Sequence, residues 1–438
     1  MIDFEFAYIA LVLTTGAFFI VVLLSYLDGI TLRLPAIALV LLVAVVYLVP
    51  AWMVRHLAGN TDIENFHYTA RLVRAGSYVY AARWPDPTYP FHPYLPFEMF
   101  VAAAADWFHQ VTNLPFSVAL KAPNIVAVGA TALLLRSAVS RIHGSASASL
   151  AALVYILNPV VVGVTAYHGQ FDAVSALLAF GAWFELRFAR SRRDQTCAAL
   201  LLGFAILSKS WPLVLLPVFL AGLSGSVRDK MLWVAIALAV PAVVSLSYSF
   251  ALHGSVDQMI RIIRGYSGIP GLGGWSQLYY KMPAGLQDRM AWVNEHSWAV
   301  LLPGLLVVTA VALAKQRRLE VGITMVLVGF FVFAPASTPE YFVWLLPFAI
   351  VSGERVFPSM YAALATVARC SLECYGHYWG WAFVPTVYHN AWILGAISYG
   401  IMVVWLCWLI VRSMRSPAEE ADPSRWVARS TSSTRRTT

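Results

Sequence analysis

Long apolar runs alternate with short polar segments along most of the 438 residues of the chain. A run of about 20 apolar residues is long enough to cross the bilayer core as an α-helix. Apolar runs cover residues 5–27, 34–54, 122–140, 146–166, 172–188, 196–208, 211–223, 231–252, 298–314, 319–335, 341–352, 357–374 and 390–411. Two of these runs, 196–208 and 211–223, are too short to cross the membrane alone. The pattern predicts an all-α polytopic membrane protein with about 11–13 transmembrane helices.

The composition supports a membrane protein. Hydrophobic residues make up 60% of the chain and charged residues only 12%, whereas a soluble domain carries about 25% charged residues. The net charge of +8 could suggest a nucleic-acid partner in a soluble protein. Most of that charge lies in short loops between apolar runs, so it predicts membrane topology and no nucleic-acid partner.

The basic residues also predict an orientation. With the N-terminus outside, the cytoplasmic loops and the tail hold 19 of the 30 Lys and Arg residues, and the longer outer loops hold 10. This count requires 94–109, which contains Glu98 and Asp106, to be an interfacial helix. We therefore expect one transmembrane domain, 1–415, with large non-cytoplasmic loops near 55–121 and 253–296. The segment 416–438 is expected to be a disordered cytoplasmic tail.

A dense polar stretch, "GNTDIENFHYTARLVRAG", follows the second apolar run. A carboxylate at the membrane edge, such as Asp62, can act as general base toward a sugar hydroxyl. Glu64 and His67 are candidates for binding the acceptor or supporting that base. The alternative is structural, because Asp62 or Thr61 before a helix is a common N-cap.

Two further polar interruptions fall on the same predicted face. "YHGQFD" places His168, Gln170 and Asp172 between two apolar runs, where ionisable groups are usually functional; the alternative is a polar turn wetted by external water. "SKSWP" places Lys209 between two short apolar segments. Its ammonium could neutralise a phosphate, or it could simply extend to the interface along its own apolar stem.

The outer loop 253–296 and a later motif complete the candidates. Arg261 and Arg264 lie one helical turn apart in "RIIRGYSGIPGLGG". "APASTPEYFVWLLPF" places Glu340 and Tyr341 at the outer start of an apolar run.

Together these motifs resemble the GT-C superfamily of glycosyltransferases that use sugars linked to polyprenyl phosphate. The likeness is to dolichyl-phosphate-glucose glucosyltransferases and to bacterial polyprenol-phosphate-mannose mannosyltransferases. "TDIENFHYTARLVRAGSYVY", "YPFHPYLPF", "HGQFD", "SKSWP" and "EYFVWLLP" match motifs of those families in order, over roughly residues 55–350. Glu340 stands where those families commonly have Gln.

The resemblance implies inverting transfer of a hexose, mannose or glucose, to a lipid-linked or glycan acceptor, with a mannosyltransferase favoured. Asp62 would be the catalytic base. The donor would be bound by His168, Gln170, Asp172, Lys209, Arg261, Arg264, Glu340 and Tyr341. No cofactor is required by this chemistry, and a divalent metal stays open. Membrane lipids are partners, in the plasma membrane or, in a eukaryote, the endoplasmic reticulum, with the site on the non-cytoplasmic face.

Two other functions fit a chain with many spans. A secondary transporter or lipid-glycan flippase should carry charges near the middle of several spans. Here the polar residues gather at one predicted face, which favours the enzyme. A polysaccharide polymerase or ligase shares Arg-rich external loops and stays open.

Overall fold

The computed structural model describes residues 2–26, 32–55, 61–82, 92–265, 274–276, 295–315, 318–366 and 384–415. The regular elements in these ranges are helices, and no strand occurs among them. They are α1 (Ile2–Tyr26), α2 (Ala36–Val43), η1 (Ala44–Leu48), α3 (Val49–Met53), α4 (Thr61–Arg74), η2 (Val79–Ala81), α5 (Pro96–Thr112), α6 (Phe116–His143), α7 (Ser145–Ile156), α8 (Pro159–Val162), η3 (Gly163–His168), α9 (Asp172–Arg187), α10 (Arg192–Ser208), η4 (Trp211–Leu215), α11 (Leu216–Gly222), α12 (Val227–Ala251), α13 (Val256–Gly265), α15 (Trp298–Ala314), α16 (Leu319–Phe333), η6 (Pro339–Tyr341), α17 (Phe342–Val351) and α19 (Val384–Arg415). A further apolar helix covers Val356–Thr366.

The prediction of an all-helical, multi-pass membrane protein is confirmed, whereas the helix count is not. By length and composition, four described helices could cross a membrane: Ala36–Met53, Phe116–His143, Val227–Ala251 and Ile393–Met414. A fifth span is possible if Ser145–Ile156 and Pro159–His168, bent by 44° at a short break, are counted as one. The apolar runs 298–314, 319–335 and 341–352 form helices of fewer than 18 residues. These three helices follow their predicted runs almost residue for residue, so the runs themselves are shorter than the roughly 20 residues that a span needs.

The break after α7 shows how the sequence divides an apolar run. Pro159 lacks an N–H and its fixed φ suits the first position of a helix, so a new helix starts there. Asn158 caps it, because its side-chain oxygen accepts the N–H of Val160 at 3.0 Å. The following turn, η3, is π-helical and ends at Gly169 with φ +85°. The chain therefore turns sharply before α9 begins at Asp172.

Polar residues at the N-termini of α10 and α12 determine where these two helices begin. Ser191 and Asp194 form a reciprocal capping box at the start of α10, and Ser226 and Asp229 form another at the start of α12. Each box satisfies N–H groups that a first helical turn leaves without partners. Both helices then run toward the end that holds the candidate site.

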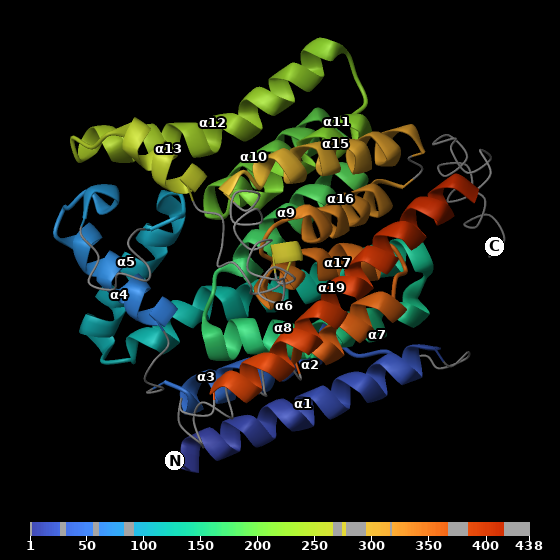
Figure 1. Cartoon of the computed structure of the whole chain (residues 1–438), viewed down its shortest axis with the longest axis horizontal. Helices are drawn as coiled ribbons and strands as arrows, with labels where there is room; N and C mark the ends of the chain where they lie inside the picture. Colours follow the sequence, from blue (N-terminus) through green and yellow to red (C-terminus); the bar gives the residue numbers. More distant parts are fainter. Residues whose placement is uncertain are drawn as a thin grey trace.

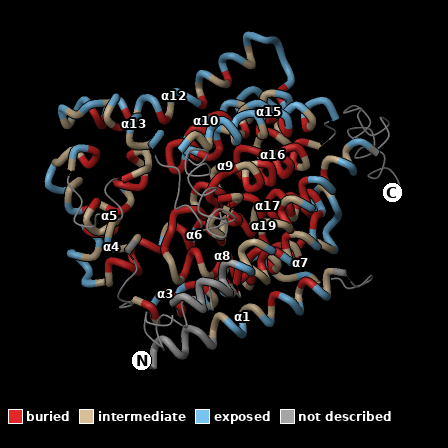
Figure 2. Tube along the Cα trace, viewed as in Figure 1, coloured by how far each residue is buried: buried red, intermediate tan, exposed pale blue. Residues whose placement is uncertain are grey.

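The buried core lies between α6, α9, α10, α16 and α17, in the middle of the molecule (Figure 2). Its aromatic centre is formed by Phe180, Trp183 and Phe348, which are fully buried. The rings of Phe180 and Trp183 stack with centroids 4.9 Å apart, and Phe348 meets Phe180 edge-on at 5.4 Å. This packing fixes α9 against α17, which carry site residues at their first turns.

Helices α4, α5 and α13 lie together beside the bundle, on the left of Figure 1. The described residues between 55 and 121 are thus largely helical. Phe66, Ala102 and Phe171 belong to a small apolar cluster that joins α4 and α5 to the bundle. The expected interfacial helix 94–109 forms α5, and α5 is not among the helices that meet the length and composition of a span.

Several expectations concern residues outside the described ranges. They are the tail 416–438 and most of the loop 253–296 beyond α13. The division into a domain and a tail therefore stays a prediction.

A glycine sets the close approach of α10 to α12. A Cβ atom at Gly203 would lie 2.5 Å from the carbonyl oxygen of Ala237 and 2.9 Å from Cβ of Val240. We expect Gly203→Ala to force the helices apart and destabilise the fold by about 1–3 kcal/mol. Gly16→Ala is the control, because no atom lies within 4 Å of that Cβ position. Thermal unfolding in detergent measures both; equal midpoints for the two variants would contradict this packing.

Candidate active site

Three segments far apart in the sequence meet at one carboxylate, that of Asp62 in the first turn of α4. The side-chain nitrogen of Gln170 donates to Oδ2 of Asp62 at 2.5 Å. Nε2 of His168 lies 3.1 Å from the same oxygen, and its Nδ1 lies 3.8 Å from Oε1 of Glu340. The imidazole therefore lies between two carboxylates, and about 23% of the Asp62 side chain stays exposed. The Asp62 side chain is therefore oriented by Gln170 and His168, which belong to another segment. A residue that only capped α4 would not need these contacts.

The backbone at Gly169 makes this meeting possible. Its φ of +85° is a conformation that side chains rarely tolerate. A Cβ atom there would also lie 3.2 Å from Cε of Lys121 and 3.5 Å from Cδ1 of Ile63. Glycine thus lets the turn between η3 and α9 lie directly against α4 and α6, and the residues on either side, His168 and Gln170, reach Asp62.

A buried ion pair forms the floor of the site. Nζ of Lys209 lies 2.8 Å from Oδ1 of Asp172, and the indole N–H of Trp344 donates to the same oxygen at 2.5 Å. Asp172 is fully buried and Lys209 is 8% exposed. The rings of Tyr94, Tyr341 and Trp344 surround the ammonium at 5.4–5.9 Å, an arrangement that favours a cation. Burial lowers the pKa of Lys209, but Asp172 and Glu98 offset this effect, so its pKa is raised overall.

Glu98 is a buried acid of the same site. From the sequence, Glu98 indicated only that 94–109 does not span the membrane. It lies on α5, is fully buried, and neither of its oxygens has a hydrogen-bond partner within the described part of the chain. Burial raises the pKa of Glu98 well above its ordinary value; Lys209 opposes the rise, and Asp172 and Asp62 add to it. An acid within an otherwise apolar helix was the signal that could have identified it.

Lys121 is the second residue that sequence reasoning missed. It lies in the second turn of α6, is fully buried beneath Gly169, and its Nζ has no partner among the described residues. A buried, unpaired ammonium is costly, so its position suggests an anionic group of a ligand. A lysine within an apolar helix was the available signal.

The structure places four of the predicted residues elsewhere. His67 stacks on Phe116 and lies 3.1 Å from Asp106, which also accepts from Arg74. Because His67 lies more than one turn beyond Asp62, it faces α5 rather than the Asp62 carboxylate. Glu64 is exposed.

Arg261 and Arg264 are also outside the cluster. Both side chains are exposed on α13, and Arg261 pairs with Asp257 one turn earlier at 2.6 Å. The apolar face of α13, which includes Met259, packs inward instead. Helical periodicity explains the outcome, because the arginines share the polar face of an amphipathic helix. Of the predicted cations, only Lys209 reaches the site.

No group of three or more His, Cys, Asp or Glu side chains suited to a metal ion occurs among the described residues. The residues that surround Asp62 are thus arranged through hydrogen bonds and ion pairs with one another.

The helices and their candidate membrane spans are those of a multi-pass membrane protein, and a family match makes it a membrane glycosyltransferase of the GT-C type. The chain matches the family model of glycosyltransferase family 87 over residues 91–321, more than half of its length, and belongs to that family. Comparison with curated proteins gives no match. Glu98, His168, Asp172 and Lys209 lie within the matched region, whereas Asp62 precedes it.

The raised pKa of Glu98 gives a pH-dependent prediction. In the folded protein Glu98 holds its proton above the ordinary carboxyl pKa of 4.5, so its contribution to stability is present below that value and is lost as pH rises. Glu98→Gln mimics the protonated form and lacks this loss. We expect the unfolding midpoint of Glu98→Gln to rise relative to the wild type between pH 5 and pH 8. A midpoint difference that does not change with pH would show that Glu98 is ionised in the folded state.

Proposed function

We propose that this family 87 glycosyltransferase moves a hexose from polyprenyl phosphate to a hydroxyl of a lipid-linked or glycan acceptor. The observation that carries the proposal is the Asp62 carboxylate, held by Gln170 and His168 and still partly exposed. A general base needs this combination of fixed orientation and access to the hydroxyl proton. Mannose is the favoured sugar, with glucose as the alternative, because of the motifs shared with polyprenol-phosphate-mannose mannosyltransferases.

The proposed reaction is a single displacement at the anomeric carbon. The acceptor oxygen attacks that carbon while its proton passes to Asp62, and the bond from the carbon to the phosphate oxygen breaks. The lipid phosphate leaves with the bonding electron pair, so the configuration at the anomeric carbon inverts. His168, whose Nε2 lies 3.1 Å from the Asp62 carboxylate, can accept the proton from the base.

The surplus of acids around the site supports sugar transfer. Asp62, Asp172 and Glu340 supply carboxylates to the site, and Glu98, which holds its proton, lies beside them. Among the described residues, Lys209 is the lysine paired with one of these acids, at 2.8 Å from Asp172. Glycosyl transfer passes through a state in which the sugar carries positive charge, as in glycoside hydrolysis. Fixed carboxylates in a water-poor site stabilise such charge as it develops.

The leaving phosphate needs positive charge, and two buried lysines can supply it. Lys209 has donors left after its bond to Asp172, and Lys121 has an unpaired Nζ within the described part of the chain. Each could donate a charge-assisted hydrogen bond to a phosphate oxygen. We propose these two in place of Arg261 and Arg264, whose side chains are exposed on α13.

We propose that the reaction takes place on the non-cytoplasmic face of the membrane. The loops that connect helices at the opposite end contain Arg190, Arg193 and Arg228, and basic residues accumulate in cytoplasmic loops. The polyprenyl chain can then stay among the apolar helices while its head group meets the acceptor at the aqueous edge.

Asp62→Asn keeps the shape of the side chain and removes the base. We expect the rate of hexose transfer from a short-chain polyprenyl phosphate donor to fall by about 10²–10⁴-fold, with the unfolding midpoint little changed. Asp257→Asn is the matched control, because the Asp257 side chain is 74% exposed; its rate should equal that of the wild type. The measurement is radiolabelled product formation by purified protein in liposomes.

The same assay distinguishes the alternatives. Wild-type activity in Asp62→Asn would show that Asp62 is not the base. Transfer only from a lipid-diphosphate oligosaccharide would favour a polymerase or ligase. Movement of the labelled donor across the liposome without product would favour a flippase.

A further inference from the structure

A cavity of about 300 Å³ lies between α1, α6, α7 and α17, away from the acids around Asp62. It is bounded by His143 and Ser147 at one end and reaches Asn158 at the break between α7 and α8. His143 is the last residue of α6, whereas Lys121, beside the Asp62 cluster, lies in the second turn of the same helix. With about 1.5 Å per residue, the polar end of the cavity and the candidate active site lie at opposite ends of the bundle.

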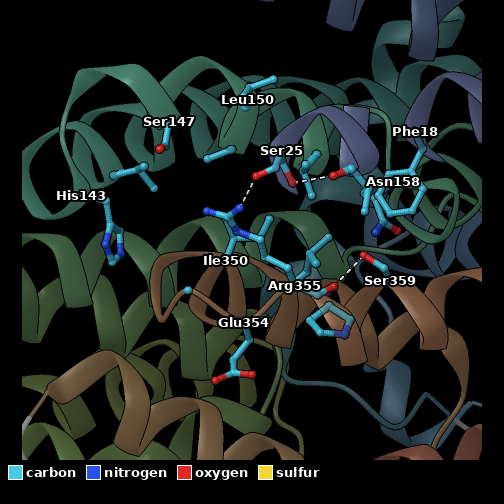
Figure 3. Close-up of a pocket in the computed structure, with 17 residues that line it drawn as sticks. Phe18, Ser25, His143, Ser147, Leu150, Asn158, Ile350, Glu354, Arg355 and Ser359 are labelled. Atoms are coloured by element: carbon cyan, nitrogen blue, oxygen red, sulfur yellow. Dashed lines mark hydrogen bonds between the residues drawn. The ribbon is translucent and has the colours of Figure 1, made fainter. Parts of the chain in front are cut away.

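One end of the cavity is polar and positively charged. Figure 3 shows Arg355 reaching across it toward Ser25, with His143 and Ser147 on one side and Asn158 on the other. Arg355 donates to the carbonyl oxygen of Ser25. Among the described lining residues Glu354 is the only acid; it points away in Figure 3 and pairs with Arg412. The charge that faces the cavity is therefore positive.

The rest of the lining is apolar. Phe18 and Val22 of α1, Leu150 and Val154 of α7, and Leu346 and Ile350 of α17 form the walls. Asn158 is fully buried at this wall, and its Nδ2 has no hydrogen-bond partner among the described residues. A buried unpaired amide costs stability unless a ligand or water satisfies it, so it points to an occupant with a polar group along an otherwise apolar stem.

The neighbouring surface indicates where that occupant comes from. The face of α1 that points away from the cavity exposes Leu13, Ile20 and Leu23, each about 60% or more exposed, so lipid chains would cover the outer side of a helix that forms one wall of the cavity. The volume, near the lower limit of about 300–1,000 Å³ for small-molecule sites, suits part of one chain with its head group rather than a whole lipid. Basic pockets between membrane helices at such an end bind anionic lipid head groups.

We propose that this cavity binds one anionic phospholipid, whose phosphate contacts Arg355 and one of whose acyl chains lies along α1, α7 and α17, with an ester oxygen directed toward Asn158. This lipid site is separate from the candidate active site, and the proposal does not depend on the proposed glycosyl transfer. The lipid completes the contact of α1 with the bundle, because it fills space between helices that otherwise meet around a void.

The test measures phosphatidylglycerol retained by the delipidated protein in detergent, by native mass spectrometry. Phosphatidylcholine with the same acyl chains and soluble glycerol 3-phosphate are the comparison probes. We expect one phosphatidylglycerol per chain, a raised unfolding midpoint with that lipid only, and about tenfold weaker binding for Arg355→Gln, as loss of a charge-assisted hydrogen bond predicts. Arg228→Gln, an exposed arginine outside the cavity, should bind as the wild type.

A second variant tests the cavity without changing charge. Ala151→Leu places bulk among the lining residues and should reduce phosphatidylglycerol binding while the protein stays monodisperse. Equal binding of phosphatidylcholine, or equal loss in Arg355→Gln and Arg228→Gln, would overturn the proposal. An equal midpoint shift with glycerol 3-phosphate would also overturn it, because the site would then take a soluble phosphate.

Discussion

The ion pair between Lys209 and Asp172 is the constraint on which the site depends. Both groups are buried, and breaking such a pair by removing one partner leaves an uncompensated charge, typically at a cost of about 3–5 kcal/mol. Lys209 comes from the break between α10 and η4, and Asp172 from the start of α9. Trp344 of α17 donates to the same carboxylate. One carboxyl group thus fixes the relative positions of three helices, and the turn at Gly169, only three residues earlier, is held with it.

That turn links structure to the proposed chemistry. Gly169 lets the chain lie close to Lys121 and Ile63, and it brings His168 and Gln170 onto Asp62. The carboxylate of Asp62 is therefore oriented by the bundle rather than by its own helix. A base positioned in this way is ready for the acceptor before the acceptor binds, which lowers the reorganisation needed for transfer.

Much of this could be predicted from the sequence, because charges interrupting apolar runs are conspicuous. Asp62, His168, Gln170, Asp172, Lys209 and Glu340 were identified as one group, and the structure brings them together. Glu98 and Lys121 were missed as members of that group, because a single charge within a helix does not reveal what the helix packs against. Arg261 and Arg264 looked equivalent to Lys209 by charge, yet the polar face of α13 leaves them exposed. The number of spans could not be predicted, since a break such as the one at Pro159 divides the run 146–166 without making it less apolar, and several other runs are close to the minimum length of a span.

The anomeric configuration of the product is the most direct test of a single displacement at the anomeric carbon with Asp62 as the base. A polyprenyl phosphate hexose of β configuration is incubated with the purified protein and acceptor, and the new linkage is determined by proton NMR from the coupling at the anomeric position. One displacement by the acceptor hydroxyl must give the α-linked product. A β-linked product would mean two displacements through a glycosyl-enzyme intermediate, and Asp62 would then not act as a base toward the acceptor alone.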